Sequence, residues 1–166
     1  MGSWAIAEAI NERYPEPAIE LKPAIKDRLI QTMSKIMDAI EPIYFNRIPE
    51  RVLNKASHEH WYRTRTIYAG MPLDQYWNEK GGDVAWKAAE PHIREITAML
   101  KENSDGPFFD GKTVTYGDFY WTGFLIFVQR LGKDDVFDVM LKLSGDEKVH
   151  LDHLKACEPW RKRNDH

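Results

Sequence analysis

The sequence predicts an all-α protein, and three observations support this prediction. Apolar residues recur three and four positions apart along almost the whole chain, which is the period of one face of an α-helix. Residues that cap helices or stop them, such as Ser57, Thr115 and Gly132, flank these periodic segments. No stretch alternates between apolar and polar residues for long enough to predict a strand with a partner. We therefore expect one all-helical domain over residues 1–166.

Two helices are expected before Pro42. Ser3 can cap the first helix, which Pro15 and Pro17 end. Its apolar side is expected to comprise Ile6, Ala9, Ile10 and Tyr14. Pro23 suits the first turn of the second helix. The buried stripe of this second helix is expected to comprise Ile25, Leu29, Met33, Ile36 and Ile40. Pro42 and Pro49 should bend or break it before residues 51–53.

The middle of the chain predicts two further helices and a loop. Ser57 is expected to cap a helix over residues 58–69, which Gly70 stops. Two glycines at 81–82 separate a short piece from a longer helix with a stripe of Ala89, Ile93, Ile96 and Leu100. Residues 103–113 are expected to form a loop with Phe108 and Phe109 turned inward. The two Asp-Gly dipeptides in this loop leave a hairpin as the alternative.

The strongest local signal lies directly after this loop. Thr115 and Asp118 have the spacing of a capping box, in which each side chain can bond the backbone of the other residue. The helix that follows, residues 119–131, is apolar nearly all round, so we expect it at the centre of the domain. Gly132 should end it, and two short helices should follow. We interpret Asp118 as a folding residue rather than a catalytic acid.

The composition limits the kinds of partner that the protein can bind and indicates its cellular compartment. The net charge of −3 offers no basic excess to neutralise a row of phosphates, so we expect no nucleic-acid partner. The densest apolar run, residues 119–128, is too short to span a bilayer, and charged residues near the N-terminus are unlike a signal peptide. Cys157 is the only cysteine, which excludes an intramolecular disulfide. We therefore expect a cytoplasmic protein without a membrane partner.

Several segments resemble the glutathione transferase family. Residues 106–111 (GPFFDG) and 115–119 (TYGDF) are similar to the loop and capped central helix of its C-terminal domain. Residues 3–7 (SWAIA), together with 13–15 (RYP), resemble the last helix of its thioredoxin-like N-terminal domain. Residues 47–54 (RIPERVLN) and 61–65 (WYRTR) look like the fungal branch.

This resemblance implies a helical bundle of the C-terminal type over residues 22–160, preceded by a remnant helix of the thioredoxin-like domain over residues 1–15. In the family, the N-terminal domain supplies the glutathione site and the catalytic residue. Ser3 matches the family position that holds the γ-glutamyl carboxylate, but its usual acidic predecessor is Gly2 here. The resemblance thus implies a chain that lacks the glutathione site and retains the site for apolar substrates. We expect no cofactor.

Ionisable groups and aromatic rings gather on the helix that Ser57 begins. His58, Trp61, Tyr62 and Arg65 are spaced i, i+3, i+4 and i+7, so they share one face. If that face meets a cavity, Arg65 or Tyr62 can polarise a carbonyl and His58 can move a proton, so we name these three as candidate catalytic residues. The alternative is a half-exposed helix with Trp61 in the core and the charges in water.

An apolar pocket is expected between the second helix and the central helix, because the resembled family keeps its apolar site there. The candidate substrate-binding residues are Tyr44, Phe45, Trp61, Tyr120, Trp121 and Phe124. Tyr120 and Trp121 are adjacent, so they cannot both face the same side. His150, His153 and Cys157 have a spacing that zinc would accept, but ordinary packing explains them as well, and we predict no metal site.

Three classes of function remain open at this point. The first is a cofactor-free enzyme, such as a cyclase or isomerase of fungal secondary metabolism, which folds an apolar substrate into a reactive conformer. The second is a carrier that binds the same kind of molecule without chemistry. The third is a truncated glutathione transferase without independent function. We expect a homodimer, because loss of a domain would uncover an apolar surface. The alternative is a monomer, in which the first helix covers all of that surface.

Overall fold

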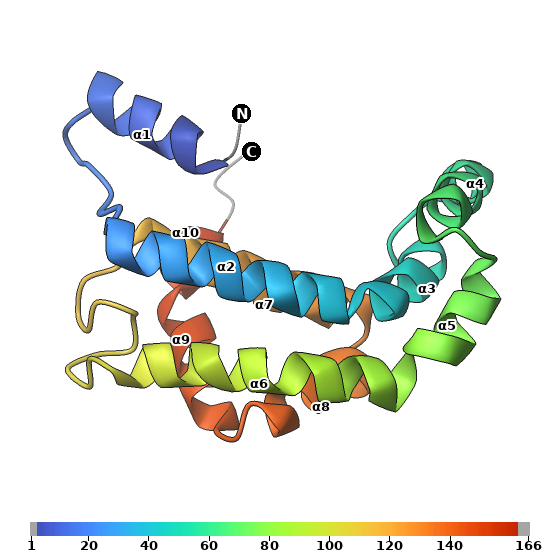
Figure 1. Cartoon of the computed structure of the whole chain (residues 1–166). Coiled ribbons are helices and arrows are strands. Elements are labelled where there is room, and N and C mark those ends of the chain that lie inside the picture. Colours follow the sequence, from blue (N-terminus) through green and yellow to red (C-terminus); the bar gives the residue numbers. More distant parts are fainter. Residues whose placement is uncertain (1–2, 163–166) are drawn as a thin grey trace.

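The computed structural model describes residues 3–162, and these residues form a helical bundle without a strand (Figure 1). The longer helices are α1 (Ser3–Arg13), α2 (Pro23–Ala39), α3 (Glu41–Arg51), α4 (His58–Ala69), α5 (Leu73–Lys80), α6 (Gly82–Lys101), α7 (Tyr116–Leu131) and α9 (Glu147–Ala156). The shorter helical segments are η1 (Lys55–Ser57), η2 (Lys133–Phe137), α8 (Asp138–Leu143) and α10 (Glu158–Arg161). The predicted all-α fold is confirmed.

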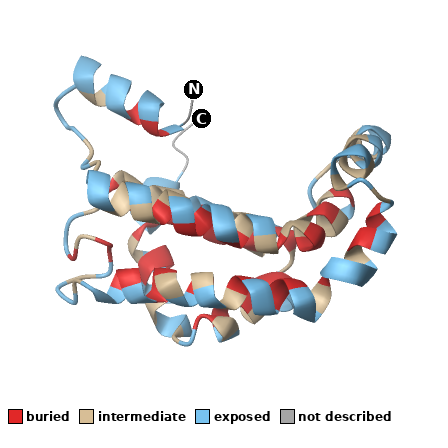
Figure 2. Cartoon of the chain, in the orientation of Figure 1, coloured by how far each residue is buried: buried red, intermediate tan, exposed pale blue. Residues whose placement is uncertain are grey.

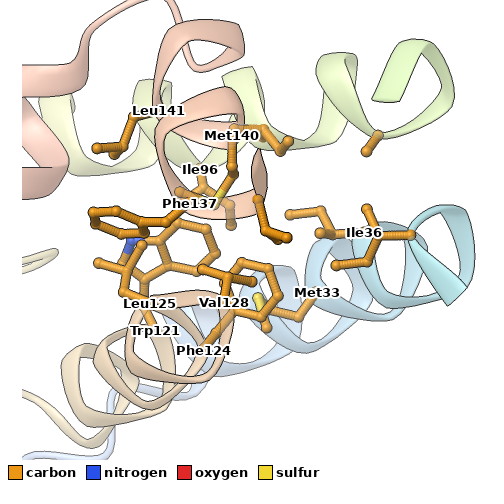
Figure 3. Close-up of a cluster of buried hydrophobic side chains, with 14 of the residues drawn as sticks. Met33, Ile36, Ile96, Trp121, Phe124, Leu125, Val128, Phe137, Met140 and Leu141 are labelled. Atoms are coloured by element: carbon orange, nitrogen blue, oxygen red, sulfur yellow. The ribbon is translucent and has the colours of Figure 1, made fainter. Parts of the chain in front are cut away.

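The core lies between α2, α6, α7 and α8 (Figure 3). Trp121, Leu125 and Val128 of α7 are fully buried, as are Leu29 and Ile36 of α2. Four of the five residues in the predicted stripe of α2 are buried, and Ile25 packs against their cluster from a half-buried position. The prediction that the segment after Thr115 forms the central helix is also confirmed, because α7 has buried residues along its whole length.

The break between α2 and α3 falls at Ile40, two residues before Pro42. Proline has no N–H to continue the hydrogen-bond ladder, so Pro42 is favoured in the first turn of a new helix, where it lies. Pro49 does not end a helix, because α3 continues through it to Arg51. The new direction of α3 carries it towards α4 and α5 at one end of the bundle (Figure 1).

The start of α7 is held by the predicted capping box. The fully buried Asp118 carboxylate accepts hydrogen bonds from the Thr115 backbone N–H at 2.7 Å and from the Thr115 hydroxyl at 2.8 Å. It also accepts from the Phe109 backbone N–H at 2.9 Å. Phe108 and Phe109 are buried, as expected, in a loop with isolated bridges but no hairpin strands. Asp118 therefore fixes both the helix and the loop before it.

Helix α1 lies apart from the other helices (Figure 1), and its buried residues are Trp4 and Ala7. The Trp4 ring meets the Tyr116 ring edge-on, with 4.6 Å between centroids. The predicted apolar side of this helix is exposed, and Figure 2 shows α1 as largely exposed. Helical periodicity identifies an apolar face, but contacts elsewhere in the molecule decide which face is covered.

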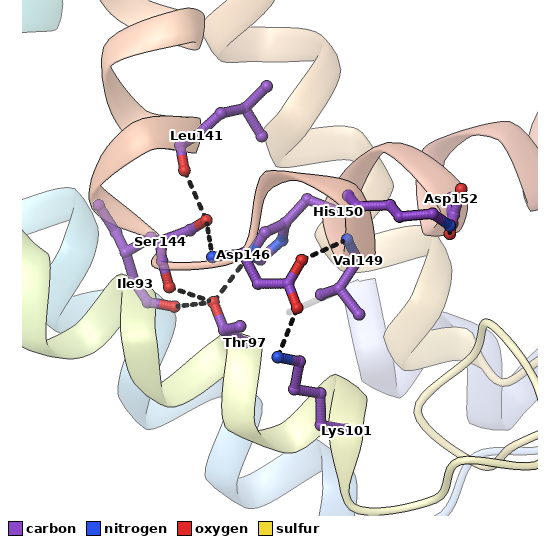
Figure 4. Close-up of polar contacts among 10 residues, drawn as sticks. Ile93, Thr97, Lys101, Leu141, Ser144, Asp146, Val149, His150 and Asp152 are labelled. Atoms are coloured by element: carbon purple, nitrogen blue, oxygen red, sulfur yellow. Dashed lines mark hydrogen bonds and ion pairs between the residues drawn. The ribbon is translucent and has the colours of Figure 1, made fainter.

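A buried polar network joins α9 to α6 and α7. His150 Nδ1 accepts from Trp121 Nε1 at 3.3 Å, so the proton on Nε2 points to Thr97 Oγ1 at 2.9 Å. The Thr97 hydroxyl can then donate to the Ser144 carbonyl at 3.0 Å. Nearby, Asp146 caps α9 and pairs with Lys101 (Figure 4). His150 thus has partners on both ring nitrogens within the fold.

Candidate ligand-binding groove

An apolar groove of about 470 Å³ runs between α2 and α7 beside the start of α1. Tyr116, Phe119, Tyr120, Gly123, Phe124 and Phe127 of α7 line it, together with Met33 and Met37 of α2 and Ser3 of α1. The α7 residues are spaced i, i+3, i+4, i+7, i+8 and i+11, which places them on one face of the helix. The groove therefore lies between the two helices where the sequence predicts a pocket.

The lining of this groove favours an apolar ligand. Its side-chain hydroxyls belong to Ser3, Tyr116 and Tyr120, and none of the described residues that line it is charged. The Tyr116 hydroxyl donates to the Ser3 carbonyl at 3.3 Å, which joins α7 to the first turn of α1. Methionine side chains are flexible and polarizable, so Met33 and Met37 can adapt to apolar molecules of different shape. Such a wall selects for apolar surface more than for a single shape.

Two of the predicted binding residues, Tyr120 and Phe124, line the groove. Trp121 faces the other way. It is fully buried, stacks on Phe124 with centroids 5.0 Å apart, and bonds His150. The expectation that Tyr120 and Trp121 face different sides is therefore confirmed. Tyr44 is half-buried and lies beside the groove residue Phe127, with ring centroids 6.1 Å apart, but it is not part of the lining. Burial raises the pKa of Tyr44 above its ordinary value.

Phe45 and Trp61 belong to a separate aromatic cluster between α3, α4 and α5. Trp61 Nε1 donates to the Phe45 carbonyl at 3.1 Å, and the two rings meet edge-on with centroids 6.0 Å apart. The Arg65 guanidinium lies over both rings, 4.6 Å from the Trp61 centroid and 5.5 Å from that of Phe45. These cation–π contacts tie α4 to α3.

His58 and Tyr62 also lie on α4, and no residue of this helix lines the groove. His58 Nδ1 lies 3.4 Å from a carboxylate oxygen of Glu50, and its Nε2 is buried without a hydrogen-bond partner among the described residues. Tyr62 is largely exposed, and the burial of the rest of its ring raises its pKa. The structure thus brings His58, Tyr62 and Arg65 to one helix as predicted, but away from the groove. Their catalytic roles stay a prediction.

Several lining residues were missing from the predicted set: Met33, Met37, Phe119, Gly123 and Phe127. A signal for them exists in the sequence, because Phe119, Gly123 and Phe127 share one α7 face with Tyr120 and Phe124. Met33 was instead assigned to the core stripe of α2, and it has both roles, since it is buried and also borders the groove. What the sequence could not supply is which face of α7 is turned towards α2.

His153 and Cys157 are also accounted for by packing. His153 Nδ1 lies 3.1 Å from the Pro107 carbonyl, and Nε2 lies 3.3 Å from Thr122 Oγ1. Both residues are fully buried. Within residues 3–162, no group of three or more His, Cys, Asp or Glu side chains is arranged to hold a metal ion. Over the same residues, none of the helices combines the length and the apolar character needed to cross a membrane.

Comparisons with known proteins agree with this architecture. The sequence model for "Glutathione S-transferase, C-terminal domain" matches residues 29–159. The chain is 26% identical over 160 residues to the glutathione S-transferase-like protein ustS of Aspergillus flavus, and the match covers 88% of this chain and 56% of that protein. It also superposes on the crystal structure of the glutathione S-transferase CsGST63524 of Ceriporiopsis subvermispora, solved in complex with glutathione, with a TM-score of 0.69 and 24% identity.

That structural match covers 98% of this chain and 66% of the Ceriporiopsis protein. The chain therefore spans between about half and two thirds of the length of the relatives it matches. The matched family domain extends over α2 to α10, which are the helices that build the core and most of the groove. This chain belongs to the glutathione S-transferase family, and residues 29–159 are its C-terminal helical domain.

Proposed function

We propose that this chain binds an apolar small molecule in the groove between α2 and α7. The observation that carries the proposal is the lining: nine residues, none of them charged, form an open hollow of about 470 Å³ beside the central helix. Pockets of this size suit drug-sized molecules, and a mostly apolar lining with a few hydroxyls is typical of them. The hydroxyls of Tyr116 and Tyr120 would orient the ligand.

The chemistry that fits this groove is a cyclisation or isomerisation without a cofactor, as in fungal secondary metabolism. Such a reaction needs a substrate held in a reactive conformer more than it needs charged groups, and orientation alone can contribute up to roughly 7–11 kcal/mol. The groove can hold an apolar substrate in such a conformer through its shape and its apolar contacts. A non-catalytic carrier is the alternative, because the same lining would serve it.

Roles for His58, Tyr62 and Arg65 in this chemistry would require a substrate that extends beyond the groove to α4. If these residues act in catalysis, Arg65→Ala and Tyr62→Phe should lower turnover more than they weaken binding, because charge stabilisation acts mainly in the transition state. If they only pack α4 against α3, the two substitutions should leave ligand affinity in the groove unchanged.

The binding proposal is tested with the neutral fluorescent probe N-phenyl-1-naphthylamine. Met37 is half-buried in the groove wall, so Met37→Glu places a charge against the ligand, and we expect at least a tenfold loss of affinity. Lys35→Glu, on an exposed position of the same helix, is the matched control and should bind as the unchanged protein does. Equal affinity in both variants would refute the proposal.

The fate of the natural ligand distinguishes an enzyme from a carrier. Native mass spectrometry of protein from its source would identify a retained molecule. An enzyme should convert it, or its precursor, to an isomer of the same mass on prolonged incubation. A carrier should return it unchanged. Retention of a molecule too large or too polar for the groove would contradict both.

We further propose a homodimer in the cytoplasm. The outward face of α1 leaves Ile6 48%, Ile10 54% and Tyr14 61% exposed, and a second hollow of about 270 Å³ lies beside them. Grouped apolar side chains of this kind commonly mark an interaction surface. Cys157 is buried and unpaired, which suits a reducing compartment.

A further inference from the structure

The hollow beside α1 has walls from three parts of the chain. It has a volume of about 270 Å³, and we call it the α1 hollow. Its lining comprises Ser3, Ile6, Ala7 and Ile10 of α1, Ile19 of the connector between α1 and α2, and Tyr116 and Phe119 of α7. None of these described residues is charged, and most of them are apolar. The α1 hollow is therefore suited to an uncharged apolar group.

Hydrogen bonds join these three parts of the chain in pairs. The Asn11 side chain donates to the Ile19 carbonyl at 2.6 Å and accepts from the Ile19 backbone N–H at 3.1 Å, which ties α1 to the connector. The Tyr116 backbone N–H donates to the Glu20 carbonyl at 2.8 Å, which ties the connector to α7. The Tyr116 hydroxyl donates to the Ser3 carbonyl, which ties α7 to α1. The positions of the three walls relative to one another are therefore set by bonds within the fold.

The α1 hollow and the groove share a border, because Ser3, Tyr116 and Phe119 line both of them. The bond from the Tyr116 hydroxyl to the Ser3 carbonyl lies at this border and is 3.3 Å long. This length exceeds the usual range of about 2.5–3.0 Å for a hydroxyl donor, so the bond is weak. A molecule that passes Tyr116 from the groove into the α1 hollow would therefore displace little.

The two spaces together favour a ligand that is long and flexible. The groove extends along α7 from Tyr116 to Phe127, which lies 11 residues further on, and this distance is about 16 Å. A molecule that fills the groove and continues into the α1 hollow is longer than this. It must also bend, because the groove lies between α7 and α2 whereas the hollow lies between α7 and α1.

We propose that the ligand of this protein is a long, flexible and uncharged apolar chain, with its main part in the groove and one end in the α1 hollow. The inference rests on the proposed function, because it places the main part of the chain in the same groove. It adds a second subsite and makes Ile19 a residue that determines specificity for length. A compact molecule would bind through the groove alone.

The test compares geraniol with geranylgeraniol, two neutral alcohols of one class that differ in length by two isoprene units. The affinity of each is measured by displacement of N-phenyl-1-naphthylamine. Ile19 is half-buried in the wall of the α1 hollow and does not line the groove, so Ile19→Asp places a charge in the hollow alone. We expect at least a tenfold loss of affinity for geranylgeraniol and no change for geraniol or the dye.

Two further variants make the result specific. Leu21→Asp is the matched control, because Leu21 is half-buried in the same connector and lines neither space, and it should leave all three affinities unchanged. Ile10 lines the α1 hollow and is 54% exposed, so it should tolerate a charge, and Ile10→Asp should repeat the effect of Ile19→Asp even if the latter does not fold. Circular dichroism identifies the variants that are folded.

The outcomes separate the inference from the proposal on which it rests. If the folded hollow variants bind geranylgeraniol as the unchanged protein does, or lose affinity for geraniol and the dye equally, the inference is wrong while the groove proposal stands. A loss of the same size in the Leu21→Asp control would also overturn the inference. If the unchanged protein binds neither the alcohols nor the dye, the groove proposal fails and the inference falls with it.

Discussion

Replacing Asp118 by alanine should destabilise this protein by about 3 kcal/mol without changing its ligand chemistry. The carboxylate is fully buried and accepts three hydrogen bonds, at 2.7, 2.8 and 2.9 Å. Its removal leaves the backbone N–H groups of Thr115 and Phe109 without a partner, and each such buried group costs about 1–3 kcal/mol. The desolvation of the carboxylate, which its removal relieves, offsets part of this sum.

Urea unfolding followed by tryptophan fluorescence and by circular dichroism measures this effect. The midpoint should fall while the slope with urea stays constant, since the surface exposed on unfolding is almost unchanged. Asp134→Ala is the control, because the side chain of Asp134 is 94% exposed, and it should change stability by less than about 0.5 kcal/mol. A loss of less than about 1 kcal/mol for Asp118→Ala would refute the assignment of Asp118 as the residue that holds α7 and the loop together.

Three further predictions concern pH, chemistry and assembly. Burial lowers the pKa of His150 to about 4, so between pH 6.5 and 4 the unfolded chain takes up a proton that the folded chain refuses, and stability should fall by roughly 3 kcal/mol across that window. The fall should be visible in urea midpoints and should be smaller in His150→Gln. A polypeptide of these 166 residues should not conjugate glutathione to standard electrophiles, and a saturable conjugation rate would contradict this. Light scattering should give about twice the chain mass of 19.4 kDa at micromolar concentration, and a mass near 19 kDa throughout would exclude the dimer.

The helices could be predicted from the sequence because their signals are local. The α2 stripe and the start of α7 at Thr115 depend on residues within a few turns of one another, and the structure has them where the pattern placed them. The break expected at the prolines falls before Pro42, whereas Pro49 lies inside α3, which ends two residues later at Arg51. The family resemblance predicted a pocket between α2 and α7, and a groove lies between these helices, but its lining depends on how α7 is rotated about its axis.

The candidate catalytic residues show where such reasoning ends. His58, Tyr62 and Arg65 were correctly assigned to one helical face, but a face becomes a site only if a cavity lies in front of it. Arg65 instead lies over two aromatic rings, and its Nε is buried without a hydrogen-bond partner among the described residues. Sequence spacing reports the neighbours of a residue within its own helix, whereas the aromatic partner Phe45 belongs to α3 and lies 20 positions away in the chain.

Helix α1 is a second case in which the spacing of residues within a helix does not identify their contacts in the fold. The side that its pattern marks as apolar is exposed, whereas Trp4 and Ala7 are buried. An amphipathic pattern shows that a helix has an apolar face, but it does not show which other part of the molecule, if any, covers that face. The exposed Ile6 and Ile10 border the hollow that also includes Tyr116 and Phe119, so the uncovered surface is continuous with the wall of the ligand groove. A partner that covers this face of α1 would therefore also contact residues that line the groove.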